Sequence, residues 1–203
     1  MEFDAVLARR RMVRRYRPDP IPSETVEKIA RVVRKAPSAG FSQGHRLLVV
    51  TGRATRERIA ALAEEHRYEA AQGRWISSAP VHMVLGVSEA DYHERYTRPD
   101  KLIDGKEMEW PAPYWWVDSG ALLMLVQLAA IDAGLATGFV TVRHDQELKE
   151  LLGLPADVAV VGVITLGLPA DDAARPADAA RLRSLRKPYG DLVRHESWNV
   201  PPP

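Results

Sequence analysis

The sequence predicts an α/β fold, or an α+β fold built from the same elements. Two observations predict it: apolar runs of strand length alternate with stretches of helical period, and 46% of the residues are hydrophobic while 27% are charged. The length of 203 residues suits one compact domain. We therefore expect residues 1–203 to form a single domain with a buried core.

Two helices and a strand are expected in the first quarter of the chain. Residues 3–11 have the pattern of a short helix, which the proline-rich segment 18–22 would end. Ser23 is a good N-cap for a second, amphipathic helix that should stop before Pro37. Its apolar positions follow the i, i+3, i+4, i+7 spacing and are Val26, Ile29, Ala30 and Val33. The apolar run 47–50 predicts a buried strand.

The middle of the chain combines regular elements with one long connection. Residues 55–72 are expected to be helical, and 81–87 to form a second strand. The following segment is polar and aromatic without a clear period, and connections of this length are often lids or binding loops. We expect a lid loop at about 88–116.

A long helix at 117–133 is apolar on nearly all sides and ends with Gly134 in the C′ position. A helix that is apolar all round is buried, and in a chain of this size it can lie at the centre of a dimer. Strands are expected at 139–142 and 158–166, with a helix at 145–152 between them. The polar residues from about 170 to 203 are expected to form an extended tail.

Composition excludes several classes of function. Lys and Arg total 28 against 27 Asp and Glu, so no overall charge favours nucleic acid or an anionic membrane. The absence of cysteine excludes disulfides and zinc–thiolate sites and suits a reducing cytosol. The most apolar run, 121–131, is too short to span a bilayer, and the N-terminus does not resemble a signal peptide. We expect a cytoplasmic protein that binds neither nucleic acid nor membrane.

Familiar cofactor motifs are missing from the sequence. No Gly-x-Gly-x-x-Gly follows a predicted strand, and there is no Walker A sequence. The six histidines do not have the spacing of metal ligands, so we expect no metal site. A nucleotide-like cofactor would have to be held in another way.

The segment 9–15 contains five arginines in seven residues. The planar guanidinium fork matches phosphate oxygens two at a time. At the end of the first helix, Arg10, Arg11 and Arg14 can converge on one phosphate. A solvated basic face or an RNA-binding arm would show the same pattern.

Three further segments have the composition of binding loops. The small residues of 36–43 let a backbone approach a flat ligand, while the two glycines of 134–139 join the long helix to a strand; each is also compatible with an ordinary turn. A late basic pair follows at 185–188. The lid loop adds aromatic residues that can stack a planar substrate or pack at a dimer interface. These are Tyr92, Tyr96, Trp110, Tyr114, Trp115 and Trp116.

Taken in order, these segments resemble the FMN-dependent nitroreductase family across essentially the whole chain. Its members open with an Arg-Arg-Ser-x-Arg-x-Phe-like motif and a Pro-x-Pro region that leads into a helix. They continue with Ala-Pro-Ser-x-x-Asn-x-Gln-Pro-Trp, Gly-Leu-x-Thr and Leu-Gly-Leu/Ile-Pro, and close with an Arg-x-Pro-Leu-like element and a late Trp. The corresponding segments here are 10–16, 18–22, 36–45, 134–137, 152–155, 186–189 and Trp198.

The resemblance implies a central, mostly antiparallel sheet flanked by helices, in an obligate homodimer with a long buried central helix. It implies a redox enzyme that passes electrons from NAD(P)H through bound FMN to a small planar acceptor by a ping-pong mechanism. The implied FMN contacts are Arg10, Arg11, Met12, Arg14, Pro37, Ser38, Ala39, Gln43, Gln72, Thr137, Gly138, Arg186 and Lys187. The implied substrate contacts are Phe41, Tyr96, Trp110, Tyr114 and Trp115.

The chain departs from the family pattern at three places. Met12 replaces the usual Ser, Phe41 replaces Asn, and Gly44-His45 replaces Pro-Trp. These departures leave a second hypothesis open, in which the protein stores or senses a flavin or deazaflavin without turnover. An RNA-binding module built on the arginines is a third hypothesis, which the overall charge of +1 disfavours.

Overall fold

A computed structural model describes residues 1–173 and 176–199, apart from the side chains of 176–179. The chain divides into two compact units, Met1–Ala170 and Asp171–Pro203. The first unit holds the sheet and the helices around it. In the second unit, the described residues form two short helices, α9 (Pro176–Ser184) and α10 (Tyr189–Leu192).

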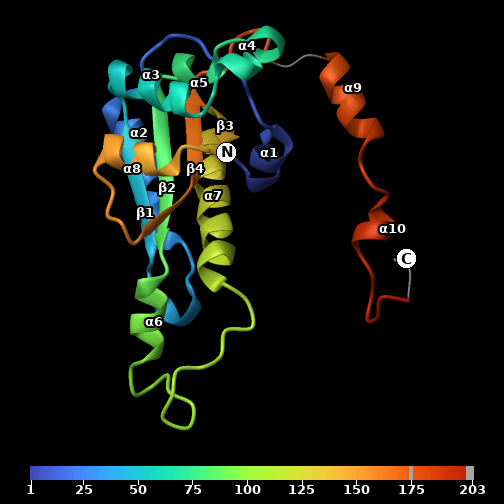
Figure 1. The fold of residues 1–203 in the computed structure, drawn as a ribbon. Helices are drawn as coiled ribbons and strands as arrows, with labels where there is room; N and C mark the ends of the chain where they lie inside the picture. The colour runs from blue at the N-terminus through green and yellow to red at the C-terminus, as the bar shows by residue number, and fades with distance from the viewer. Residues whose placement is uncertain (174–175, 200–203) are drawn as a thin grey trace. The chain divides into compact units, whose positions relative to one another are not determined.

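The first unit is built on a four-stranded antiparallel sheet with the strand order β1-β2-β4-β3 (Figure 1). The strands are β1 (His45–Val50), β2 (Val81–Ser88), β3 (Ala136–Val140) and β4 (Val158–Gly167). All eight residues of β2 are buried, so both faces of this central strand are covered, because successive side chains point to opposite faces of a sheet. The predicted antiparallel sheet flanked by helices is therefore confirmed.

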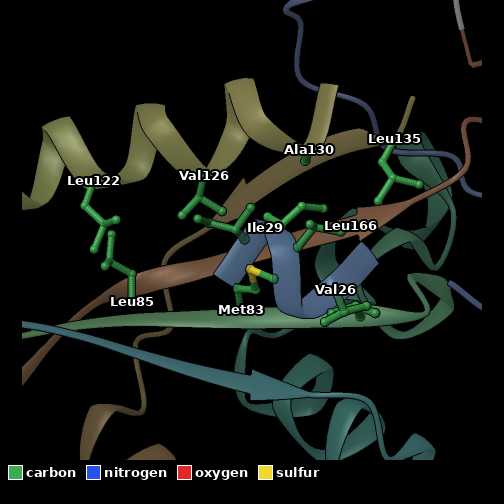
Figure 2. Close-up of a cluster of buried hydrophobic side chains, with 11 residues drawn as sticks. Val26, Ile29, Met83, Leu85, Leu122, Val126, Ala130, Leu135 and Leu166 are labelled. Carbon is green, nitrogen blue, oxygen red and sulfur yellow. The ribbon is translucent and has the colours of Figure 1, made fainter. Parts of the chain in front are cut away.

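The core lies between the sheet and the long helix α7 (Tyr114–Asp132). Leu122, Val126 and Ala130 are spaced four residues apart on α7 and are fully buried. Figure 2 shows them facing side chains from the sheet, with Ile29 of α2 (Ser23–Ala30) in the same cluster. The sheet contributes Met83, Leu85 and Leu166 to this contact.

Shorter helices complete the first unit. They are α1 (Phe3–Arg9), η1 (Arg31–Lys35), η2 (Ala39–Phe41), α3 (Arg53–Leu62), α4 (His66–Gln72), α5 (Trp75–Ser78), α6 (Ala90–Tyr96) and α8 (Asp145–Leu152). The predicted helices at 3–11, 23–36 and 145–152 are present, although the second tightens into the 3₁₀ turn η1 before Pro37. Ser23 is the first residue of α2 and makes no capping hydrogen bond, so its assignment as the N-cap was wrong.

Three predicted elements differ from the structure. The helix expected at 55–72 is two helices, because Glu64 adopts a positive φ of 55° that interrupts the turn. The lid loop contains α6, which the polar sequence did not reveal. The strand expected at 139–142 begins earlier, at Ala136.

Helix α7 begins at Tyr114 and has 19 residues, which makes it longer than the apolar run of the sequence indicated. By length and composition it is the one helix of the described residues that could cross a membrane. Of its most apolar stretch of 18 residues, 39% is buried inside the chain. A core helix of a folded domain passes the same criteria. Within one chain α7 is buried along one side only, because Trp116, Val117 and Met124 are exposed.

Candidate functional site

The arginine-rich segment is fixed against strand β3. Met12 forms a parallel bridge with Thr137, and the Val13 backbone N–H donates to the Thr137 carbonyl oxygen over 2.8 Å. Further along, the Arg17 N–H donates to the carbonyl oxygen of Leu168 at 2.9 Å. Two segments that the sequence singled out, 10–16 and 134–138, therefore lie side by side.

Tyr16 and Gly138 determine how closely this segment approaches the sheet. The buried Tyr16 hydroxyl donates to the Val13 carbonyl oxygen at 2.8 Å and lies 2.7 Å from Thr165 Oγ1. Burial raises the Tyr16 pKa well above its usual value, so the phenol stays neutral. A Cβ at position 138 would lie 2.8 Å from both the Val13 oxygen and Trp75 Cζ3, so only glycine fits between them.

Three arginines of the segment, Arg10, Arg11 and Arg14, form no ion pair with a carboxylate among the described residues. Arg14 lies over the ring of Trp75, 5.5 Å from its centroid. In the part of the chain that the structure describes, the side chains of Arg10 and Arg11 make no hydrogen bond or ion pair. Beside them a cavity of about 300 Å³ is lined by Arg9, Arg11 and the turn that follows α7. Arg10, Arg11 and Arg14, which we call the cationic cluster, thus have no carboxylate partner among the described residues, and Arg11 lines the hollow.

Two buried polar atoms near Gly138 lack a hydrogen-bond partner in the described part of the chain. The side-chain oxygen of Thr137 and the indole nitrogen of Trp75 are buried and have no hydrogen-bond partner among the described residues. Buried polar groups usually have a partner, so each of these atoms is an exception. Gln72, the last residue of α4, is half-buried three residues before Trp75.

The loop 37–43 is held by a buried carboxylate on α7. Asp118 Oδ2 accepts one hydrogen bond from the Ala39 backbone N–H and another from the Tyr92 hydroxyl, each at 2.9 Å. Ser38 Oγ accepts from the Gln43 backbone N–H at 2.9 Å. These bonds make the loop a fixed structure, with Pro37, Ser38 and Ala39 at the N-terminal end of α7.

The aromatic residues of the lid gather beside this loop. Trp110 is central: its ring centroid lies 4.5 Å from that of Tyr96, 5.8 Å from that of Trp115 and 6.1 Å from that of Tyr114. The structure therefore brings together four of the five side chains that the resemblance assigned to the substrate. Trp115 is buried, whereas Tyr114 is 37% exposed.

Glu107 connects the later part of the lid loop to α6, which lies in its earlier part. It accepts hydrogen bonds from the Trp110 indole N–H and from His93 Nδ1, both at 2.6 Å. Trp110 and then His93 hold the pKa of Glu107 below its usual value. The carboxylate in turn raises the pKa of His93, to which Glu89 also contributes.

The two groups of predicted cofactor contacts lie at opposite ends of α7 (Figure 1). Asp118 holds the 37–43 loop near one end, while at the other end Asp132 accepts from the N-terminal amine of Met1 at 2.5 Å and Arg11 lines the hollow beside Ile131. Asp118 and Asp132 are fourteen positions apart on the helix, or about 21 Å at 1.5 Å per residue. One chain therefore does not bring the arginines and the loop together.

The remaining predicted contacts, Arg186 and Lys187, are exposed and lie in the second unit between α9 and α10. Their role as phosphate ligands stays a prediction. No group of three or more metal-ligating side chains gathers among the residues that the structure describes.

Comparison of the chain with known protein families identifies the family to which it belongs. The family model described as "Nitroreductase family" matches residues 7–168, a range that contains the arginine segment, the loop and the whole sheet. The chain belongs to the nitroreductase family. The resemblance inferred from the sequence is thereby confirmed.

Relatives of this nitroreductase-family chain have different activities in their names. An NADH dehydrogenase of Thermus thermophilus is 27% identical over 190 residues, which cover 81% of the chain and 85% of that relative. A 5,6-dimethylbenzimidazole synthase of Rhodospirillum rubrum is 29% identical over 184 residues, covering 84% and 83%. Family membership by itself therefore does not select one reaction.

The fold is shared with solved members of the family. The NADPH:FMN oxidoreductase of Vibrio harveyi, complexed with NAD⁺, superposes with a TM-score of 0.70 at 22% identity. The match covers 97% of this chain and 78% of that one. At this identity the likeness concerns the fold alone.

Three residues that organise the site were missed by sequence reasoning. Asp118 had a signal, because it is a lone charge within the otherwise apolar run 114–131. Tyr16 was part of a motif, but its contact with Thr165 crosses 149 residues of sequence. Trp75 had no local signal, since its neighbours Val13 and Gly138 come from distant segments.

Proposed function

We propose that this chain is an FMN-dependent oxidoreductase that takes reducing equivalents from NADH or NADPH and passes them to a small planar acceptor in a ping-pong reaction. Nitroaromatics and quinones are acceptors of the right shape and redox chemistry. Membership of the nitroreductase family supports the proposal, as does the FMN named for the Vibrio harveyi structure.

The observation that carries the proposal is the cationic cluster. Arg10 and Arg11 are without hydrogen-bond or ion-pair partners in the described chain, and the guanidinium of Arg14 lies over the ring of Trp75. Like charges gathered without an anion repel one another, and a phosphate dianion supplies the acceptor oxygens that guanidinium forks fit. The donor set therefore fits the phosphate of FMN, and the bond between Val13 and Thr137 holds it beside the cavity.

We propose further that the complete site is shared by two copies of the chain. The loop is held at Asp118 and Arg11 lies beside Ile131, and the helix between residues 118 and 132 is about 21 Å long, so a second copy is needed to put a loop near the arginines. The exposed apolar side chains of α7 and of the neighbouring α1 offer a surface for it. These side chains are Phe3, Leu7, Trp116, Val117 and Met124.

Bound FMN would supply the redox chemistry by accepting a hydride from the nicotinamide and returning two electrons to the acceptor. The protein residues have positional tasks. The arginines would bind the phosphate, the 37–43 loop and the segment at Thr137 and Gly138 would orient the ring, and the aromatic lid would exclude water from the acceptor. No protein acid or base is required to start the transfer, because the flavin itself carries the redox chemistry.

An absorbance spectrum followed by anaerobic addition of NADH and NADPH tests the proposal. We expect flavin bands that bleach on addition of one nicotinamide and recover when a nitroaromatic is added. Flavin bands that do not bleach would favour a protein that stores or senses the cofactor. Failure to bind added FMN would contradict the proposal altogether.

A further inference from the structure

Phe41 is the large apolar side chain with the greatest exposure among the described residues, at 71%. It lies in η2, within the loop held by Asp118. Its ring makes no aromatic contact with the cluster around Trp110. An exposed ring on a loop of this kind loses hydrophobic stabilisation without a gain inside its own chain.

The backbone at Phe41 is in an unfavourable conformation. Its φ is +62°, in the left-handed region that bulky residues rarely occupy and that glycine and asparagine adopt more readily. Gly40 before it has a φ of +58°, and Gln43 after it has a φ of +56°. The loop therefore tolerates a bulky residue at a position suited to a small one, which is a pattern found at functional sites.

Several contacts keep the loop in this conformation. The Phe41 backbone N–H donates to the Ser38 carbonyl oxygen at 2.9 Å. Arg95 of α6 donates to the Gly40 carbonyl oxygen, also at 2.9 Å, and the ring of Tyr96 packs so closely on Gly40 that an added Cβ would lie 2.6 Å from it. The ring of Phe41 is thus presented outward from a base that the surrounding structure fixes.

We infer that Phe41 is a specificity-determining residue that stacks against the acceptor, and that it selects aromatic acceptors over non-aromatic ones. The inference rests on the proposed function and names the class of substrate for the same site. A flat aromatic compound gains from an offset or edge contact with a phenyl ring, and an inorganic oxidant does not. The strained backbone is then retained because the ring it presents contributes to binding.

Three substitutions distinguish the effect of the Phe41 ring from the effect of the strained backbone that carries it. Phe41→Asn removes the ring and relieves the backbone, Phe41→Leu removes the ring and keeps the strain, and Phe41→Tyr keeps both. Each variant is compared with the wild-type protein for kcat/KM with 2,4-dinitrotoluene and with ferricyanide, and for melting temperature. Sedimentation velocity measures the oligomeric state of each variant.

We expect the ratio of kcat/KM for dinitrotoluene to that for ferricyanide to fall about two- to tenfold in Phe41→Asn and Phe41→Leu, and to stay near the wild-type value in Phe41→Tyr. We expect Phe41→Asn alone to raise the melting temperature, by about 2–4 °C. An unchanged ratio in the Leu variant would overturn the inference. So would a loss of oligomers in the Asn and Leu variants, because the ring would then pack between chains.

The same measurements distinguish a failure of the Phe41 inference from a failure of the proposed function. If wild-type protein reduces neither acceptor with NADH or NADPH, the oxidoreductase proposal fails before any variant is compared. If wild type reduces both and the ratio does not depend on the ring, the oxidoreductase proposal stands and the role of Phe41 is refuted.

Discussion

The backbone N–H of Val13 lies 2.8 Å from the carbonyl oxygen of Thr137, and this bond joins the arginine segment to the strand that follows α7. Thr137 pairs on its other side with Leu166 of β4, so the segment is an extension of the sheet at its β3 edge. The position of the cationic cluster is therefore determined by the sheet. A free N-terminal arm would not hold its guanidinium groups in one place.

Replacement of Arg14 by alanine is expected to weaken FMN binding. Loss of a hydrogen bond to a charged group costs about 1.5–3 kcal/mol, which corresponds to about a 10- to 150-fold increase in Kd. Fluorescence titration of the apoprotein with FMN measures this. Arg34→Ala removes an exposed arginine of η1 and serves as the control. Equal affinities in both variants would remove Arg14 from the phosphate site.

The close approach at Gly138 predicts a loss of stability in Gly138→Ala. The new Cβ would lie 2.8 Å from the Val13 carbonyl oxygen, and this backbone atom is held in place because it accepts the hydrogen bond of the buried Tyr16 hydroxyl. Overpacking of this kind costs about 1–3 kcal/mol in the free energy of unfolding, measured by urea denaturation. In Gly52→Ala the Cβ meets only Thr55 Oγ1 at 3.8 Å, so that variant should unfold like the wild type.

Removal of the Asp118 carboxylate is expected to release the 37–43 loop. Asp118→Ala leaves the Ala39 N–H and the Tyr92 hydroxyl without their acceptor, at a cost of about 1–3 kcal/mol for each buried group. Hydrogen exchange at the Ala39 amide should accelerate strongly. Tyr92→Phe removes the other bond and leaves the Ala39 bond intact, so protection of that amide should largely survive. If the Ala39 amide is equally protected in Asp118→Ala, the carboxylate does not anchor the loop.

The contact between His93 and Glu107 predicts that the stability contributed by the lid loop depends on pH. The pKa of His93 is raised in the folded state, so its stabilising contribution is present below the ordinary value of 6.5 and is lost as the pH rises through the raised value. The Glu107 pKa is lowered, so its contribution is lost only in acid, as the pH falls through that lowered value. The difference in melting temperature between wild type and His93→Gln should therefore shrink from about pH 6 to about pH 9. A difference that grows with pH would contradict this assignment.

The sequence predicted those elements whose signals are local. The spacing of Val26 and Ile29 indicated α2, and the position of Gly134 after the apolar helix indicated where α7 ends; its φ of +81° agrees with that role. The break between α3 and α4 occurs at Glu64, and the next residue, Glu65, turns inward to accept from the backbone N–H groups of Ile76 and Ser77. That contact joins residues more than ten positions apart, and no pattern within the helix predicts it.

The candidate site was predictable as a set of segments but not as an arrangement. The arginines and the segment at Thr137 are adjacent, as the resemblance implied, because both are parts of one sheet edge. The 37–43 loop lies at the far end of α7, and its anchor is the single carboxylate Asp118. The distance between the two parts follows from the length of α7, which begins three residues earlier than its apolar pattern predicted.

The exposed face of α7 gives a prediction for assembly. Val117 is 59% exposed on this face, and Val117→Glu would place a charge in the proposed interface. We expect a folded monomer, judged by circular dichroism, with at least about a tenfold weaker affinity for FMN. Val49→Glu alters an exposed valine of β1, away from α7, and should leave assembly unchanged. A dimer that survives Val117→Glu would place the interface elsewhere.

The central claim is that one FMN site is built from two chains, and sedimentation velocity of the FMN-loaded wild-type protein, monitored at the flavin absorbance band, tests it most directly. We predict that the flavin sediments with a species of twice the 22.6 kDa chain mass, and that dilution to monomer releases it into the slowly sedimenting free pool. Flavin that continues to sediment with the monomer would show that one chain holds the cofactor alone, and would contradict the account.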